Sequence, residues 1–266
     1  MLLSCMLHRL DKDGLIVITQ PAHAWISGQL ARNWGNQTFG NFAPAEEVCL
    51  AAEQHDIGFL EWEQTPALNR KTGLPETFLE MPTEAHLEIW SKGIRQMMRF
   101  GRYPALLVSM HFTFLCQQHP ARDGAEAGES QQQFLQQQQQ LQSAIRTSLL
   151  NDAYYAPWST DEIIQRNRQL VSLWDWLSLL LCMGFAEEQV ILDVPSANGT
   201  CQLVLAHATD SSSHLRLTPW PFQSDTVRLI CEGRRLLKTW TQETELHEAL
   251  KAASPLTLCF DFVKGE

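Results

Sequence analysis

Apolar residues recur at helical spacing through most of the first two thirds of the chain. The run from Pro44 to Glu63 has no internal proline, and Thr65-Pro66 ends it. One face of this run carries Val48, Ala51, Ala52, His55 and Phe59. Similar patterns predict helices over 22–34, 83–97, 105–115 and 170–183. We therefore expect a helical core over roughly residues 21–186.

The pattern changes near Glu188, where short alternating or apolar runs replace the helical period. The runs are 190–194, 202–208, 215–217, 226–231 and 256–263, with turn formers at Asn198-Gly199 and Asp210-Ser211. They predict an antiparallel sheet within residues 187–266, covered by a helix over 243–252. A strand over 15–19, in an N-terminal strand region of residues 1–20, could join its edge. The expected fold class is α+β: a mainly helical bundle with a small antiparallel β-rich C-terminal part.

A polar stretch interrupts the helical part. Residues 117–130 are rich in Gly, Glu and Ala, and glutamine fills nine of the next twelve positions. Glutamine is a good helix former, and Phe134, Leu141, Ile145 and Leu149 fall on one stripe. These features predict a mobile loop over 117–130 and a Gln-rich helix over 131–150. The loop is either a lid over a substrate or a tolerated surface insertion.

Several histidines and aspartates fall inside the predicted helices. In chain order they are His23, His55-Asp56, His86, His111 and Asp175. Burial of an ionised carboxylate costs on the order of several kcal/mol unless the group is paired, hydrogen-bonded or bound to a metal. The set therefore predicts a site for one or two divalent ions inside the helical core. For any one of these histidines alone, a hydrogen-bonded core residue is the competing interpretation.

This order of residues resembles the HD-domain superfamily of metal-dependent enzymes, and the string His55-Asp56-Ile57-Gly58 is similar to its central motif. The resemblance implies that His23, His55, Asp56 and Asp175 hold one ion. It also implies that Asp56 bridges to a second ion held by His86 and His111, as in dinuclear members. The strings at 18–23, 55–62 and 217–222 further resemble a bacterial family known only as a domain of unknown function.

The chain also departs from the better-known members of the superfamily. Many of them carry a lysine directly after the His-Asp-x-Gly string, where it can meet an anionic substrate, whereas this chain has Phe59. No Gly-Tyr-Pro motif follows His111, which argues against cyclic-dinucleotide hydrolysis. Lys92 and Arg95, one to two turns beyond His86, are the candidates for the missing positive charge, and an exposed basic helix face explains them equally well.

The expected function is metal-dependent hydrolysis of a small, phosphorylated molecule. Two-metal activation of water would supply the chemistry, with Asp56 and Lys92 as the catalytic candidates. A mixed-valence di-iron oxygenase is the first alternative, because a mixed His and carboxylate set suits iron or manganese at least as well as zinc or magnesium. The second alternative is a non-catalytic relic of the fold that binds a ligand or a partner protein.

Composition narrows the choice of partner. The formal net charge is -10 and no basic stripe is evident, which argues against nucleic-acid and anionic-membrane binding. A small molecule is the expected partner. The seven cysteines are scattered without a Cys-x-x-Cys pair, which is typical of buried thiols in a reducing cytoplasm. Met1–Leu10 lacks the pattern of a signal peptide.

Overall fold

The structure, a computed structural model, describes residues 6–119, 121, 124–208 and 211–265. Its longer helices are α1 (Gln20–Asn33), α2 (Ala45–Gln54), α3 (Thr83–Met97), α4 (Arg102–Gln118), α5 (Ala125–Leu150), α6 (Asp161–Met183) and α7 (Glu243–Ala252). Short 3-10 turns are η1 (Ile57–Leu60), η2 (Trp62–Gln64), η3 (Phe78–Glu80) and η4 (Ala156–Trp158). The strands are β1 (Met6–Asp11), β2 (Gly14–Thr19), β3 (Leu68–Asn69), β4 (Leu74–Pro75), β5 (Gln189–Ser196), β6 (Gly199–Ala208), β7 (Ser211–Thr218), β8 (Thr226–Leu236) and β9 (Pro255–Val263).

The main sheet has seven strands in the order β1-β2-β8-β9-β7-β6-β5. Neighbouring strands are antiparallel except β7 and β9, which run parallel with His214 opposite Asp261. Buried and exposed side chains alternate along β8, so one face of this strand packs inward. The strands expected after Glu188 are therefore present. The predicted starts of β5, β8 and β9 lie within one residue of the observed ones, whereas Gln202 and Leu215 lie inside β6 and β7.

The expected fold class is wrong in the size and kind of its sheet. Helices make up 51% and strands 25% of the structure, and the sheet is large, curled and mixed instead of a small antiparallel appendage on a helical bundle. The N-terminal hairpin enlarges it, because β2 pairs with β8 through Leu15 opposite Leu236. The strand expected over 15–19 therefore joins the edge of the C-terminal sheet, as predicted, but alternation in the sequence did not identify β8 as its partner or β1 as a further strand.

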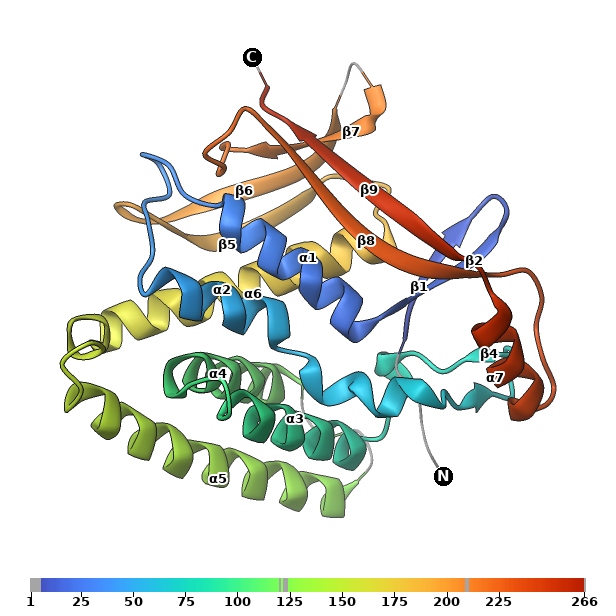
Figure 1. The fold of residues 1–266 in the computed structure, drawn as a ribbon, viewed down its shortest axis with the longest axis horizontal. Helices are drawn as coiled ribbons and strands as arrows, with labels where there is room; N and C mark the ends of the chain where they lie inside the picture. The colour runs from blue at the N-terminus through green and yellow to red at the C-terminus, as the bar shows by residue number, and fades with distance from the viewer. Residues whose placement is uncertain (1–5, 120, 122–123, 209–210, 266) are drawn as a thin grey trace.

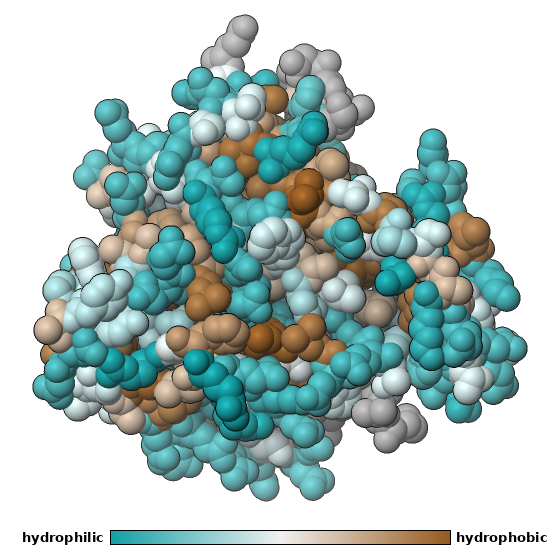
Figure 2. All heavy atoms as spheres, in the orientation of Figure 1, coloured by the Kyte–Doolittle hydropathy of each residue, from teal (hydrophilic) through white to brown (hydrophobic). Residues whose placement is uncertain are grey.

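Helices α1 to α6 lie in layers against one face of this sheet (Figure 1), whereas α7 packs with Leu15 and Val17 of β2, in a cluster separate from the main core. Helices α1 and α6 pack on the sheet and on each other, α2 and α4 come next, and α3 and α5 lie farthest away. Trp34 and Trp174 are fully buried where α1 meets α6, with ring centroids 6.0 Å apart. The functional side chains described below come from these inner layers. Figure 2 shows one outer face of the molecule, on which hydrophobic residues form small patches among hydrophilic ones.

The helix expected over Pro44–Glu63 is interrupted at the His-Asp pair. Helix α2 ends at Gln54, His55 keeps helical angles, and Asp56 (φ -97°, ψ 19°) breaks the run before η1. Gly58 explains the break, because its backbone lies against α3. A Cβ atom there would come 2.3 Å from the Ile89 carbonyl oxygen. The inward face is as predicted, since Val48, Ala51, Ala52, His55 and Phe59 are all buried.

Helix α5 begins at Ala125, so the last part of the loop expected over 117–130 is helical, and residues 117–118 end α4. Residues 120, 122 and 123 of that loop, Asp210 of an expected turn and residues 1–5 of the N-terminal region lie outside the described residues. The Gln-rich helix over 131–150 is present as part of α5. Its glutamines dock it on α4, since Gln138 accepts from the Ser109 hydroxyl and Gln142 donates to it.

Among the described residues, no helix combines the length and the apolar character needed to cross a bilayer. The cysteines in this part of the chain, which are 49, 116, 182, 201, 231 and 259, form no disulfide.

We expect Gly58→Ala to lower the free energy of unfolding by about 1–3 kcal/mol, because the added methyl group would overlap backbone atoms of α3 that cannot move aside cheaply. Gly128→Ala is the matched control. Gly128 lies in α5 with open space around its Cα, so alanine should raise stability by up to about 1 kcal/mol. Urea unfolding of both variants measures the difference. Equal effects would contradict the close approach of η1 to α3.

Candidate metal centre

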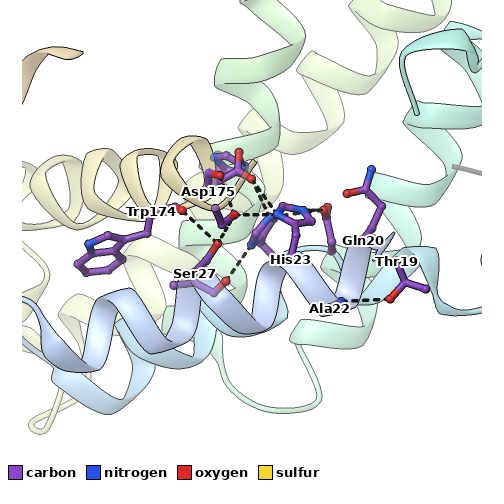
Figure 3. Close-up of polar contacts among 12 residues, drawn as sticks. Thr19, Gln20, Ala22, His23, Ser27, Trp174 and Asp175 are labelled. Atoms are coloured by element: carbon purple, nitrogen blue, oxygen red, sulfur yellow. Dashed lines mark hydrogen bonds and ion pairs between the residues drawn. The ribbon is translucent and has the colours of Figure 1, made fainter. Parts of the chain in front are cut away.

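His23 reaches the centre from the first turns of α1. The Thr19 hydroxyl caps this helix by accepting from Ala22 N at 3.2 Å. The buried His23 ring lies with Nε2 2.8 Å from Asp56 Oδ2 and Nδ1 2.8 Å from Ser178 Oγ (Figure 3). Ser178 donates its own hydroxyl proton to the Asp175 carbonyl at 2.7 Å, so it accepts from His23 Nδ1. This arrangement turns the Nε2 lone pair toward Asp56.

His55 and Asp56 enter from the break between α2 and η1. His55 Nδ1 donates to the Ala52 carbonyl at 2.8 Å, which fixes the proton on Nδ1 and leaves Nε2 pointing inward. His55 Nε2 lies 3.5 Å from Asp56 Oδ2 and 3.2 Å from Asp175 Oδ1. The adjacent pair therefore directs both side chains to the same point, because the chain leaves the helix between them.

Asp175 and His111 complete the group from α6 and α4. Asp175 is 7% exposed, although Trp176 beside it is 47% exposed, so the helix turns the carboxylate inward. His111 Nε2 lies 3.5 Å from Asp175 Oδ2, and His111 Nδ1 lies 2.9 Å from Ser172 Oγ. Asp175 thus lies between His55 on one side and His111 on the other.

These five side chains form two overlapping groups that could hold a metal ion. The groups are His23, His55 and Asp56, and His55, His111 and Asp175, each with its candidate ligand atoms within 4.8 Å of one another. The Nε2 atoms of His55 and His111 are buried and have no hydrogen-bond partner in the described structure. Each histidine has its Nδ1 atom engaged elsewhere, which is the usual support of a metal-binding imidazole. The residues present therefore fit one or two ions.

The protonation of these groups shows how much the buried carboxylates need a positive charge. Burial alone would lower the pKa of His55, but the charges of Asp56 and Asp175 outweigh it and raise the pKa to about 9. Burial lowers the pKa of His111 to about 4. Burial opposes ionisation of Asp175, yet His55 and then His111 hold its pKa well below the usual range. The surrounding histidines therefore favour the ionised form of the buried Asp175 carboxylate.

His86 lies in the same cavity but in neither group of candidate ligand atoms. Its ring stacks on Trp90 with centroids 5.3 Å apart and planes at 14°, and it contacts Phe59 edge-on at 6.3 Å. Its role as a ligand to a second ion stays a prediction. Lys92 forms an ion pair with Glu61 and is absent from the cavity lining that the described residues form. Its catalytic role likewise stays a prediction.

The centre opens into a cavity of about 570 Å³. Its walls come from α1, η1, η3, α3, α4, α5 and α6, and most of the wall surface is apolar. Such a volume is typical of small-molecule sites, which span roughly 300–1,000 Å³. A small molecule can therefore reach the carboxylates and the histidines from one side.

The sequence interpretation missed the residues that support the ligands. Ser172 and Ser178 lie three positions before and after Asp175 on α6, a spacing that places all three on one helix face. This spacing could have indicated from the sequence that both serines lie beside Asp175. Glu63 was also missed: its carboxylate accepts from Gln20 N at 2.8 Å, and burial raises its pKa well above the usual range. No local pattern links Glu63 to the start of α1.

One comparison with known proteins returned a match. The model of a family described as "Protein of unknown function (DUF3891)" matches residues 6–238, which includes all five side chains of the centre. No curated protein and no solved structure matched the chain.

We expect Ser178→Ala to weaken metal binding by about 10- to 100-fold while the fold persists, because His23 would lose the group that orients its ring. Competition with a fluorescent chelator measures the affinity. Ser159→Ala is the matched control, since Ser159 is also buried and its hydroxyl donates to the Tyr155 carbonyl at the end of η4, outside the cavity lining. Equal metal affinity in the two variants would show that Ser178 does not support a ligand.

Proposed function

Because the chain belongs to DUF3891, a family described only as of unknown function, we propose from the site itself that the protein is a metal-dependent hydrolase of the HD type. The observation that carries the proposal is the convergence of three imidazole Nε2 atoms on two buried carboxylates at the end of a cavity. The order His23, His55-Asp56, Asp175 supports the HD assignment, with His111 as the additional histidine of a dinuclear member.

The protein's own groups have distinct tasks in this proposal. His23, His55, Asp56 and Asp175 would hold one divalent ion, and His111 with Asp175 would contribute to a second. When bound, such ions lower the pKa of water and neutralise charge that develops on the substrate. Ser178, Ala52 and Ser172 fix the three rings, so the ligands need no reorganisation on binding. The apolar walls exclude bulk water from the reacting bond.

A mixed-valence di-iron oxygenase is the second candidate function. The apolar cavity favours it, because oxygenases act on C–H bonds that need no charged residue for recognition. The ligand set suits iron and manganese as well as zinc. Iron content and oxygen uptake therefore separate the two candidates.

We expect protein purified without affinity-resin metals or chelators to contain one to two divalent ions per chain by elemental analysis. Iron together with substrate-dependent oxygen uptake would favour the oxygenase, whereas zinc, manganese or magnesium with turnover of an ester panel would support the hydrolase. A protein that holds no metal even after reconstitution would exclude both enzymes and leave the non-catalytic relic.

We expect Asp175→Asn to weaken metal binding by at least about 100-fold, because it removes a shared ligand, and loss of a supporting hydrogen bond alone costs about 10- to 100-fold. The exchange is nearly isosteric, so the fold should persist. Asp152→Asn is the control, since Asp152 pairs with Arg102 away from the centre. Normal metal content in Asp175→Asn would overturn the assignment of Asp175.

A further inference from the structure

The cavity beside the metal centre has mostly apolar walls. Four elements supply most of the apolar lining: η3 gives Phe78 and Leu79, α3 gives Leu87 and Trp90, α4 gives Phe112, Phe114 and Leu115, and α6 gives Trp176, Leu179 and Met183. The metal centre lies in this same lining. A ligand that fills the cavity must therefore place much of its surface against carbon.

One wall is a fixed aromatic stack. The ring of Trp90 lies nearly parallel to His86 on one side (14°) and to Phe112 on the other (13°, centroids 5.0 Å apart). Phe134 of α5 contacts Trp90 at 6.1 Å. Packing by neighbouring rings holds Trp90 in place, so this part of the wall is aromatic and suits contact with an alkyl chain or a ring system.

The charges near the cavity disfavour a phosphorylated ligand. None of the described residues that line it is a lysine or an arginine, and Lys92 is engaged with Glu61. The anionic side chains Asp56 and Asp175 lie in the lining. A phosphate would therefore meet histidines and amides in the described lining but no arginine or lysine, because Arg168, which lies over Phe114, is not part of that lining.

Gln20 adds one polar contact next to the centre. Its side chain lines the cavity, is only 2% exposed, and has an Oε1 atom without a hydrogen-bond partner in the described structure. Gln20 precedes His23 by three residues on α1, and the two side chains rise from the same side of the helix (Figure 3). An unpaired buried amide oxygen is destabilising, and a ligand N–H or O–H would satisfy it.

We propose that the cavity takes an amphipathic substrate: an apolar chain or ring system lies along the walls, and a polar, unphosphorylated head group with an N–H or O–H meets the metal centre and Gln20. The proposal rests on the proposed function and names the substrate class of that same site. It replaces the phosphorylated molecule expected from the sequence.

The test compares octanohydroxamic acid with acetohydroxamic acid on the metal-loaded protein by calorimetry. Both carry the same metal-binding head group with an N–H and an O–H, and only the first has a long alkyl tail. Burial of each methylene favours binding severalfold, so the octyl compound should bind at least about 100-fold more tightly. Equal affinity of the two, or tighter binding of glycerol 1-phosphate than of octanohydroxamic acid, would overturn the inference.

Substitutions in the cavity wall test whether the alkyl tail binds there. Leu179→Arg should cut the advantage of the tail to less than about tenfold without changing the metal content or the affinity for acetohydroxamic acid. Leu179→Asn is a milder second variant should the arginine impair folding. Leu192→Asn is the control, since Leu192 is 67% exposed on β5. A tail advantage that survives both Leu179 variants would place the alkyl chain elsewhere.

A last experiment distinguishes a wrong substrate class from a wrong proposed function. Protein stripped with a chelator is titrated with 1-hexanol and 1-decanol, which need no metal. Tighter binding of decanol supports the apolar cavity even if the protein turns out to hold no metal, in which case only the proposed function fails. If the stripped protein binds both alcohols with equal affinity, and the untreated protein holds its expected metal, only the substrate class is wrong.

Discussion

The structure depends on the burial of two carboxylates, Asp56 and Asp175, at one point. Each is 7% exposed, and the groups around them are imidazoles whose Nδ1 atoms are already engaged. Two negative charges this close cannot remain ionised in a protein interior without a cation. Either a proton on His55, whose pKa is raised to about 9, or a metal ion must supply it. The layered helices hold all five side chains at that point, so fold and chemistry share one electrostatic requirement.

Separate parts of the chain converge there for different physical reasons. Helix α1 presents His23 because Thr19 and the strand before it set where the helix begins. His55 and Asp56 are presented by a break in the helix, which the close packing of Gly58 on α3 requires. Helix α6 contributes Asp175 together with two serines on the same face, so one helix supplies both a ligand and the support for the rings of His23 and His111.

Much of this was readable from the sequence. Helical periodicity located α1, α3, α4 and α6, and the inward face of α2 marked His55 as buried. Alternation located the strands after Glu188. The edge position of β2 was expected, but its partner β8, more than two hundred residues away, and the parallel contact of β7 with β9 were not readable from local patterns. The break at Asp56 was missed because it depends on α3, which no local pattern reveals. The apolar character of the cavity was missed for the same reason: its walls come from elements that are distant in sequence.

The packing of α1 on β8 has a consequence for the order in which contacts form during synthesis. Helix α1, which carries His23, packs on β8, and its Gln29 exchanges two hydrogen bonds with the Ile230 backbone at 2.8 and 3.0 Å. Helix α1 is translated well before β8, and so are α2 and α6, on which it also packs. The contacts with β8 wait for that strand, so the helix that carries His23 reaches its full packing only after β8 has been made.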